Sequence, residues 1–241
     1  MKRAFPILAI LTVLLLAYAF YEAIWVAPME RTMGDVQRIF YYHVPSAWTA
    51  FLLFFVNLIA SVIYLVRRNP KADALAVVSA EVGVVLCTVV LVTGPIWARP
   101  VWGIWWTWDI RLTTTLVLWL IYVSYLVLRR FSDSSQTPKL AAVLAIFGAL
   151  DVPLVYFSIW FFRTQHPQPV IGGGGSIDPR MLHVLLLNWL AFSCLAFVVC
   201  WARYRLEMLR RAVEEAEALE SMLGPGPAAQ TSKVPLNRGR Q

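Results

Sequence analysis

Charged residues are scarce in this chain: they make up 15% of its 241 residues, whereas hydrophobic residues make up 59%. A soluble domain is about a quarter charged, so this composition excludes an ordinary soluble fold and predicts an all-α polytopic membrane protein. The formal net charge of +7 does not indicate nucleic-acid binding. The basic residues lie in short loops beside apolar runs, where they set the orientation of a membrane protein.

Cysteine is equally scarce, and the three cysteines, Cys87, Cys194 and Cys200, all lie inside apolar runs. The absence of C-x-x-C and C-x-x-C-H motifs argues against a redox pair, a zinc site and a covalent haem attachment. A phosphate-binding loop with its lysine and a G-x-S-x-G elbow are also absent, so we expect neither ATP hydrolysis nor a hydrolytic triad. The sequence therefore predicts a protein that is not an enzyme.

Six apolar runs are long enough to cross about 30 Å of hydrocarbon, which takes about 20 helical residues. We expect transmembrane helices at 5–26, 46–66, 72–93, 112–128, 140–162 and 181–202. Only six of the 21 lysines and arginines lie in the first, third and fifth connecting loops. The positive-inside rule therefore places both termini in the cytoplasm, and all three histidines of the chain on or near the outer side.

Residues 1–203 form the expected six-helix domain, and two further segments follow it. Apolar residues such as Leu206, Leu209 and Val213 recur at helical spacing over 204–223, which predicts a cytoplasmic amphipathic helix. This helix either docks on a partner or extends into solvent. Residues 224–241 are rich in proline, glycine and small polar residues, so we expect a disordered tail.

Tryptophan is concentrated in the stretch 94–113, GPIWARPVWGIWWTWDIRLT, which lies between the third and fourth spans. Five of the eleven tryptophans of the chain are here: Trp97, Trp102, Trp105, Trp106 and Trp108. An aromatic belt at the membrane interface explains one or two tryptophans per helix end. We therefore favour a functional aromatic surface over a belt.

The spacing within this stretch suggests how the surface is built. Pro95, Pro100 and Gly103 argue against one continuous helix through it. On a single helical turn, residues at i, i+3 and i+4 share a face, and this applies to Trp102, Trp105 and Trp106. We expect a broken, partly helical platform with charged side chains beside it, namely Asp109, Arg99 and Arg111. Asp109 is expected to hold the platform rigid.

Two histidines at the outer ends of spans are candidate metal ligands: His43 begins the second span and His183 the sixth. Neutral imidazole binds haem iron, and two such rings can hold a planar cofactor from its two faces. The alternative is an interfacial histidine that bonds only to backbone. Indoles cover the apolar porphyrin well. Arginine binds carboxylates such as propionates, and the candidates are Arg99, Arg111, Arg38 and Arg180. We interpret His166 as an ordinary loop residue.

Two acids lie inside spans, Glu81 in the third and Asp151 in the fifth. Charge inside a membrane is costly, so we expect both acids to be neutral and hydrogen-bonded, for example to Asn57 or Asn188. Functional and structural roles stay equally open for them.

Two motifs in the chain resemble those of a known family. The pattern W-G-x-W-W-x-W-D-x-R-L-T at 102–113 looks like the WWD signature of haem-handling membrane proteins. Together with HVPSAW at 43–48, it is similar to the CcmC family of the cytochrome c maturation system. The segment from Asp151 to His166 is also similar to that family, and the resemblance covers roughly residues 31–190. We call residues 94–113 the WWD segment.

The resemblance implies a function and a site. CcmC-like proteins bind haem b transiently at the outer, periplasmic face of the bacterial inner membrane. They pass it to the haem chaperone CcmE and assemble with the ABC transporter subunits CcmA and CcmB and the small membrane protein CcmD. By this resemblance His43 and His183 are the axial ligands of the iron. The other implied haem-binding residues are Trp97, Trp102, Gly103, Trp105, Trp106, Trp108, Asp109, Arg99 and Arg111.

Three rival functions remain at the level of sequence. A WWD-type ligase that attaches haem to apocytochrome usually has Pro-Lys-Glu-Thr after the aspartate, where this chain has Ile-Arg-Leu-Thr. A haem-bearing electron-transfer subunit would have pairs of histidines within the bilayer. A transporter without a cofactor would use discontinuous helices around Glu81 and Asp151.

Overall fold

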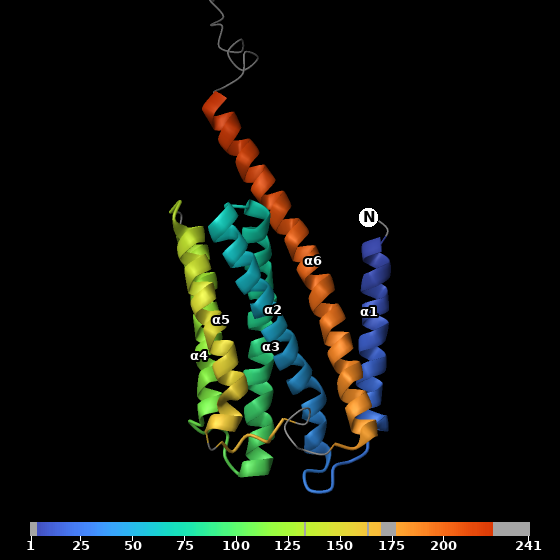
Figure 1. The fold of residues 1–241 in the computed structure, drawn as a ribbon. Helices are drawn as coiled ribbons and strands as arrows, with labels where there is room; N and C mark the ends of the chain where they lie inside the picture. The colour runs from blue at the N-terminus through green and yellow to red at the C-terminus, as the bar shows by residue number, and fades with distance from the viewer. Residues whose placement is uncertain (1–3, 133, 163, 170–176, 224–241) are drawn as a thin grey trace, which may run out of the picture.

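The computed structural model describes residues 4–132, 134–162, 164–169 and 177–223. Within these residues the protein is an all-α bundle without strands, as expected (Figure 1). Its long helices are α1 (Ala4–Tyr21), α2 (Phe40–Arg67), α3 (Pro70–Trp102), α4 (Ile110–Phe131), α5 (Thr137–Phe161) and α6 (Pro179–Leu223). A π-helical turn, η1 (Glu22–Val26), ends α1, and a 3₁₀ turn, η2 (Asp35–Ile39), precedes α2.

All six helices are long and apolar enough to cross a membrane, which confirms the expected number of spans. Their ends differ from the expected ones. The helix α2 begins before His43, and α3 continues through Pro95 and Pro100 to Trp102. Neighbouring helices and local adjustments satisfy the backbone groups that proline frees in such bundles. Gly103, with a positive φ of 77°, ends α3 instead, and its N–H bonds to the carbonyl of Arg99 at 3.0 Å.

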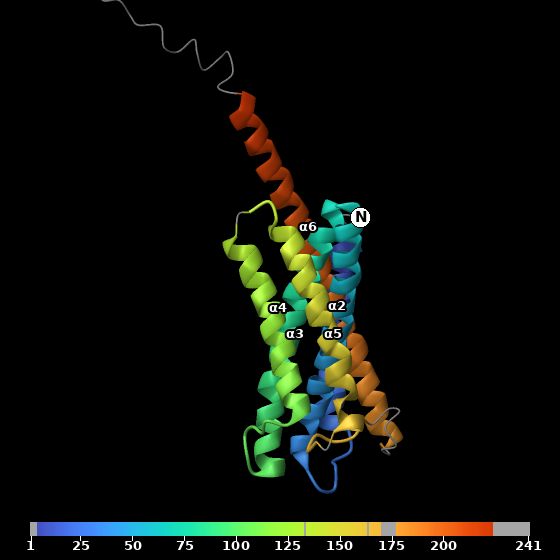
Figure 2. The same ribbon diagram turned by 60° about the vertical axis from the view of Figure 1, so that its left-hand side comes forward.

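The helices α2 and α3 pack side by side in the middle of the bundle (Figures 1 and 2). The pair α4 and α5 lies on one flank, and α6 lies on the other with α1 packed along it. The start of α1 and the far part of α6 are at one end of the bundle. The turn between α3 and α4, the start of α2 and the start of α6 are at the opposite end.

Glycine sets the distance between neighbouring helices at two places. The ring of Phe54 stacks on that of Tyr122, with centroids 3.9 Å apart and an angle of 13°. A Cβ atom at Gly83 would lie 2.7 Å from the Phe54 ring, and one at Gly148 would lie 2.8 Å from Ile121. These contacts show the close approach that small residues allow between membrane helices.

Buried amides join helices through backbone carbonyls. The side chain of Asn57 donates to the carbonyl of Ala76 at 2.6 Å, and that of Asn188 donates to the carbonyl of Ala19 at 3.2 Å. Neither amide partners an acid, so the expected bonds to Glu81 and Asp151 are wrong. Asp151 is buried, and its Oδ2 has no hydrogen-bond partner among the described residues.

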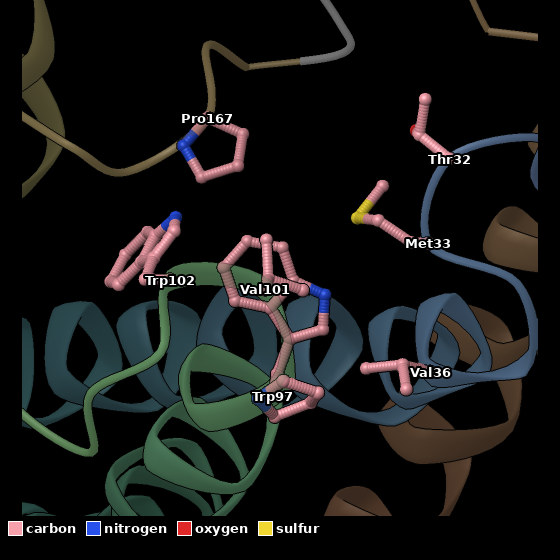
Figure 3. A pocket seen from close by; sticks show the side chains of 8 residues that line it. Thr32, Met33, Val36, Trp97, Val101, Trp102 and Pro167 are labelled. Atoms are coloured by element: carbon pink, nitrogen blue, oxygen red, sulfur yellow. The ribbon is translucent and has the colours of Figure 1, made fainter.

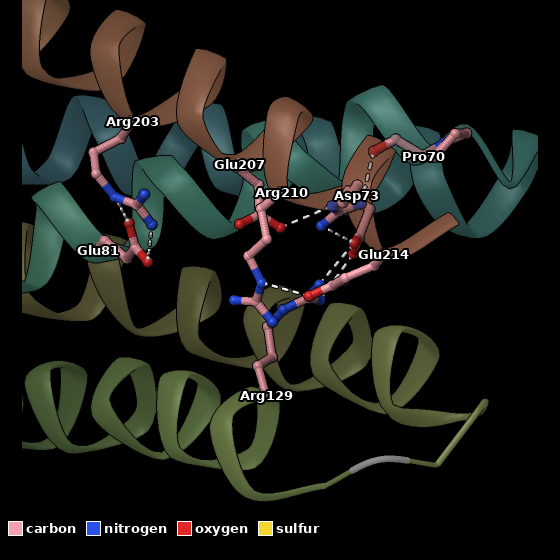
Figure 4. Close-up of polar contacts among 9 residues, drawn as sticks. Pro70, Asp73, Glu81, Arg129, Arg203, Glu207, Arg210 and Glu214 are labelled. Atoms are coloured by element: carbon pink, nitrogen blue, oxygen red, sulfur yellow. Dashed lines mark hydrogen bonds and ion pairs between the residues drawn. The ribbon is translucent and has the colours of Figure 1, made fainter. Parts of the chain in front are cut away.

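Glu81 is ion-paired rather than isolated (Figure 4). The Nε and Nη2 atoms of Arg203 each donate to one oxygen of Glu81 at 2.8 Å. The expectation of a neutral acid is wrong, because it took no account of Arg203, which lies just beyond the expected end of the sixth span. Because α6 continues as one helix, Arg203 instead lies on a turn that faces α3.

The far part of α6 is fixed to the bundle by a second group of charges (Figure 4). Asp73 is buried and accepts from both Nη atoms of Arg129 at 2.8 and 2.7 Å, and from Nη2 of Arg211 at 2.9 Å. Glu207 accepts from Arg211 at 2.7 Å. Residues 204–223 thus continue α6 without a break, and the tail predicted at 224–241 lies outside the described residues.

Candidate functional site

A cavity of about 1080 Å³ lies at the end of the bundle opposite the far part of α6. Its volume matches that of the largest cofactor pockets, which range from about 300 to 1,000 Å³. The walls come from α2 to α6 and from the loops that contain residues 28–33 and 166–169. Most lining side chains are apolar, with a few polar groups among them. We call this space the large cavity.

The WWD segment forms one wall of the large cavity, but not as a helical face. Since α3 ends at Trp102, residues 103–109 are non-helical, and the helical face expected for Trp102, Trp105 and Trp106 does not exist. Helix α4 then begins with Asp109 as its N-cap, whose carboxylate accepts from the N–H of Arg111 at 2.9 Å. Residues 103–109 of the WWD segment therefore form a short non-helical connection between α3 and α4, with Gly103 at one end and Asp109 at the other.

The five tryptophans of this segment divide into two groups. Trp97, Trp102 and Trp106 line the large cavity. Trp105 and Trp108 are 58% and 77% exposed and do not line it. The rings of Trp97 and Trp102 meet edge to face at 5.2 Å, and those of Trp106 and Trp108 at 5.9 Å. One group thus presents aromatic surface to the large cavity, and the other presents it outward.

A smaller hollow of about 390 Å³ adjoins the large cavity at its outer edge. Figure 3 shows Pro167 facing Trp97 and Trp102, with Met33 across from them. These four residues line both spaces. The large cavity and the smaller hollow therefore adjoin at these four residues.

His43 lies on α2 and faces the large cavity. Its Nδ1 atom is 2.9 Å from the hydroxyl oxygen of Thr93, and that hydroxyl donates its own proton to the carbonyl of Val89 at 2.6 Å. The hydroxyl therefore accepts from Nδ1–H of His43, which leaves the lone pair of Nε2 free. A ring fixed in this way by a second group is typical of a metal-binding histidine.

His166 also lines the large cavity, which the sequence analysis did not anticipate. Its Nδ1 atom lies 2.9 Å from the carbonyl oxygen of Pro167. A carbonyl only accepts, so Nδ1 carries the proton and Nε2 is again free. Burial, and then the charge of Arg111, lower the pKa of His166 to about 3, so its ring is neutral at pH 7.

His183 does not line the large cavity, and its side chain is exposed. The α6 residues that turn inward around it are Met181, Val184 and Leu185, so His183 lies on the opposite arc of the helix. The structure therefore brings His43 together with His166, and it does not bring His43 together with His183. The sequence signal for His166 was its place among three histidines at one end of the bundle.

The candidate arginines differ in what they bind. Arg38 donates to Asp35 and to the carbonyl of Ala23. Arg180 pairs with Asp178, and Arg99 donates to the carbonyl of Gly103. Arg111 lines the large cavity, and its buried Nη1 has no partner among the described residues.

Trp106 adds a second donor of this kind, because its buried indole N–H also lacks a partner among the residues that the structure covers. Buried donors without partners are costly. The two side chains therefore suit a ligand with acceptor oxygens.

Asp109 joins two segments that are distant in the sequence. Besides Arg111, it accepts from the N–H of Gln165 at 3.0 Å and from the side chain of Thr164. Burial alone would raise the pKa of this carboxyl, but the hydrogen bonds from Thr164, Gln165 and Arg111 outweigh it and lower the pKa below its ordinary value. Asp109 is therefore a carboxylate at neutral pH, and it does not line the large cavity.

Comparison with known proteins gives a consistent result. The family model described as CcmC, heme exporter protein C, matches residues 1–219. Heme exporter protein C of Bradyrhizobium diazoefficiens is 38% identical, over 91% of this chain and 84% of its own. The protein of the same name from Haemophilus influenzae is 34% identical, over 85% of each chain. That from Escherichia coli K12 is 32% identical, over 83% of this chain and 82% of its own.

Proposed function

The chain belongs to the heme exporter protein C family, and from this premise we propose that it binds haem in the large cavity and passes it to the chaperone CcmE. The family takes part in haem delivery for cytochrome c maturation, and the chain is a multi-pass membrane protein. The observation that carries the proposal is the large cavity, whose walls include His43, His166, Arg111 and five tryptophans, three of them from the WWD segment.

The ligands in this proposal are His43 and His166. Each ring holds its proton on Nδ1 by a hydrogen bond, so each offers Nε2 to a metal. Haem is the cargo here, and its iron supplies the metal that these two atoms bind. The exposed position of His183 argues against its predicted role as the second ligand.

The remaining groups fit the other parts of a haem molecule. Trp97, Trp102 and Trp106 offer flat apolar surface to the porphyrin. Arg111 and the indole N–H of Trp106 offer hydrogen bonds to propionates, which would satisfy their buried donors. The other predicted haem-binding residues, Arg99, Gly103 and Asp109, shape the WWD segment instead of lining the large cavity.

The exposed tryptophans, Trp105 and Trp108, are the proposed contact with CcmE. Large exposed aromatic side chains at the edge of a binding site are typical anchors for a partner. By the distribution of lysine and arginine, this end of the bundle is periplasmic and both termini are cytoplasmic. CcmA, CcmB and CcmD remain the proposed partners in the membrane.

The rival functions fit the molecule less well. An electron-transfer subunit needs haem between histidines deep in the bilayer, but both free imidazoles lie at one end of the bundle. A transporter site around Glu81 is not favoured, because Arg203 already pairs with that acid. The family match favours haem delivery over direct ligation of haem to apocytochrome.

The test is the visible spectrum of protein purified in mild detergent and loaded with haem. We expect a six-coordinate spectrum that is lost in His43→Ala and in His166→Ala. His183→Ala is the matched control, and it should keep the spectrum. A six-coordinate spectrum that depends on His183 and not on His166 would contradict the proposed pair of ligands.

A further inference from the structure

The carboxylate of Asp109 has a different partner on each oxygen. Oδ1 accepts from the N–H of Arg111 at 2.9 Å, which caps α4. Oδ2 accepts from the N–H of Gln165 at 3.0 Å, and Gln165 precedes His166. One side chain thus serves both the start of a helix and a loop that lies 56 residues further along the chain.

The loop 164–169 has few other attachments. The N–H of His166 donates to the hydroxyl of Thr164 at 3.1 Å, and its Nδ1 donates to the carbonyl of Pro167. Both of these bonds are local. The hydrogen bonds that join this loop to another described element all end on Asp109, from Gln165 and from the side chain of Thr164.

Building on the proposed function, we propose that Asp109 is the positioning residue for His166. Its carboxylate holds the backbone beside His166 and so keeps the imidazole on the wall of the large cavity.

Asparagine at position 109 separates the two tasks of this side chain. Asparagine caps helices as well as aspartate does, so Asp109→Asn keeps the bond to Arg111 and the start of α4. The asparagine side chain has one carbonyl oxygen and one amide nitrogen. When the oxygen accepts from the N–H of Arg111, the amide group, which is a donor, faces the N–H of Gln165 and cannot bond to it. Asp109→Ala loses both bonds. Asp35→Asn is the matched control, because Asp35 is exposed at the same end of the bundle and its side chain bonds to Arg38 alone among the described residues.

The first measurement uses protein without haem. Diethyl pyrocarbonate modifies accessible neutral imidazoles, and peptide mass spectrometry reports His166 separately from the other histidines. We expect about tenfold faster modification of His166 in Asp109→Asn, the change that follows from loss of a hydrogen bond to a charged group. We expect no change in Asp35→Asn or in the thermal stability of Asp109→Asn. Unchanged modification of His166 in Asp109→Asn would overturn the proposal.

The second measurement uses haem-loaded protein. We expect Asp109→Asn to lose haem about tenfold faster than the wild type. If Asp109 acts through His166, the double variant with His166→Ala should lose haem no faster than His166→Ala alone. Additive effects would show that Asp109 acts elsewhere. If the wild type retains no haem, the proposed function fails, whereas the modification of His166 still decides whether Asp109 positions it.

Discussion

At the scale of single residues, the large cavity is lined by several side chains that have a donor or acceptor without a hydrogen-bond partner among the described residues. The two histidines each use Nδ1 and leave Nε2 free, and Arg111 and Trp106 carry buried donors without partners among the described residues. Native proteins seldom leave such groups unsatisfied, so unpartnered donors on a cavity wall are candidates for hydrogen bonds to a ligand or to water. Arg111 is the clearest case, because the other candidate arginines are bonded to neighbouring protein atoms.

The role of Arg111 is testable with an altered ligand. We expect Arg111→Gln to weaken haem binding about tenfold or more, because it removes a charge-assisted bond of about 1.5–3 kcal/mol. The dimethyl ester of haem has no carboxylates, so its affinity should be similar in the wild type and in Arg111→Gln. Titration followed by absorbance gives both affinities. An equal loss for haem and for its ester would mean that Arg111 does not bind propionates.

At the scale of helices, the bundle depends on close approach at a few glycines. Gly83 brings α3 against the ring of Phe54, which is fully buried and stacked on Tyr122. The ring has no free space to move into, so an added methyl group must displace a helix. Gly94, on the same helix, has room, since a Cβ atom there would lie 3.5 Å from His43.

We therefore expect Gly83→Ala to destabilise the protein by about 1–3 kcal/mol, the usual cost of overpacking. Gly94→Ala should cause no loss of stability, because the contact that it makes is an ordinary one. Thermal unfolding in detergent compares the two variants. A similar melting temperature for Gly83→Ala and the wild type would show that the packing of α2 on α3 is less constrained than the distances indicate.

The sequence predicted helices well and their ends poorly, for physical reasons. Hydropathy is a local property, so it was enough to identify the six spans. The order of the spans then placed all three histidines at one end of the bundle. Two features depend on tertiary contacts that the sequence does not reveal: α3 continues through its prolines as far as Trp102, and Glu81 pairs with Arg203 of α6. The sequence had no local signal that ranks His166 against His183, because their placement depends on the bond from Asp109 to the loop of His166 and on the rotation of α6, which turns His183 outward.

At the scale of the whole molecule, the two ends of the bundle have different chemistry. One end carries the large cavity and the aromatic WWD segment, and the other carries the ion pairs of Asp73 and Glu81 with arginines of α4 and α6. Asp73 joins three helices, α3, α4 and α6, through Arg129 and Arg211. It is buried, so without it Arg129 would lose its counter-ion, and Arg211 would keep only Glu207.

We expect Asp73→Ala to destabilise the protein by about 3–5 kcal/mol, the cost of leaving the buried charge of Arg129 without a partner. The far part of α6 should then become sensitive to limited proteolysis. Glu214→Gln is the control, since the pair of Glu214 and Arg210 is more than half exposed and such pairs contribute about 0–1 kcal/mol. Equal protease resistance of α6 in Asp73→Ala and the wild type would refute the anchoring role of Asp73.

The unbroken course of α6 has a geometric consequence. A helix of 45 residues measures about 67 Å at 1.5 Å per residue, more than twice the thickness of the hydrocarbon layer. Its first turn borders the large cavity and its far part is tied to α3 through Arg203 and Arg211, so one helix contributes to both ends of the bundle. Insertion of one residue midway would rotate the part of α6 beyond it by about 100° about the helix axis. Insertion of seven residues would return that part to within about 20° of its original orientation.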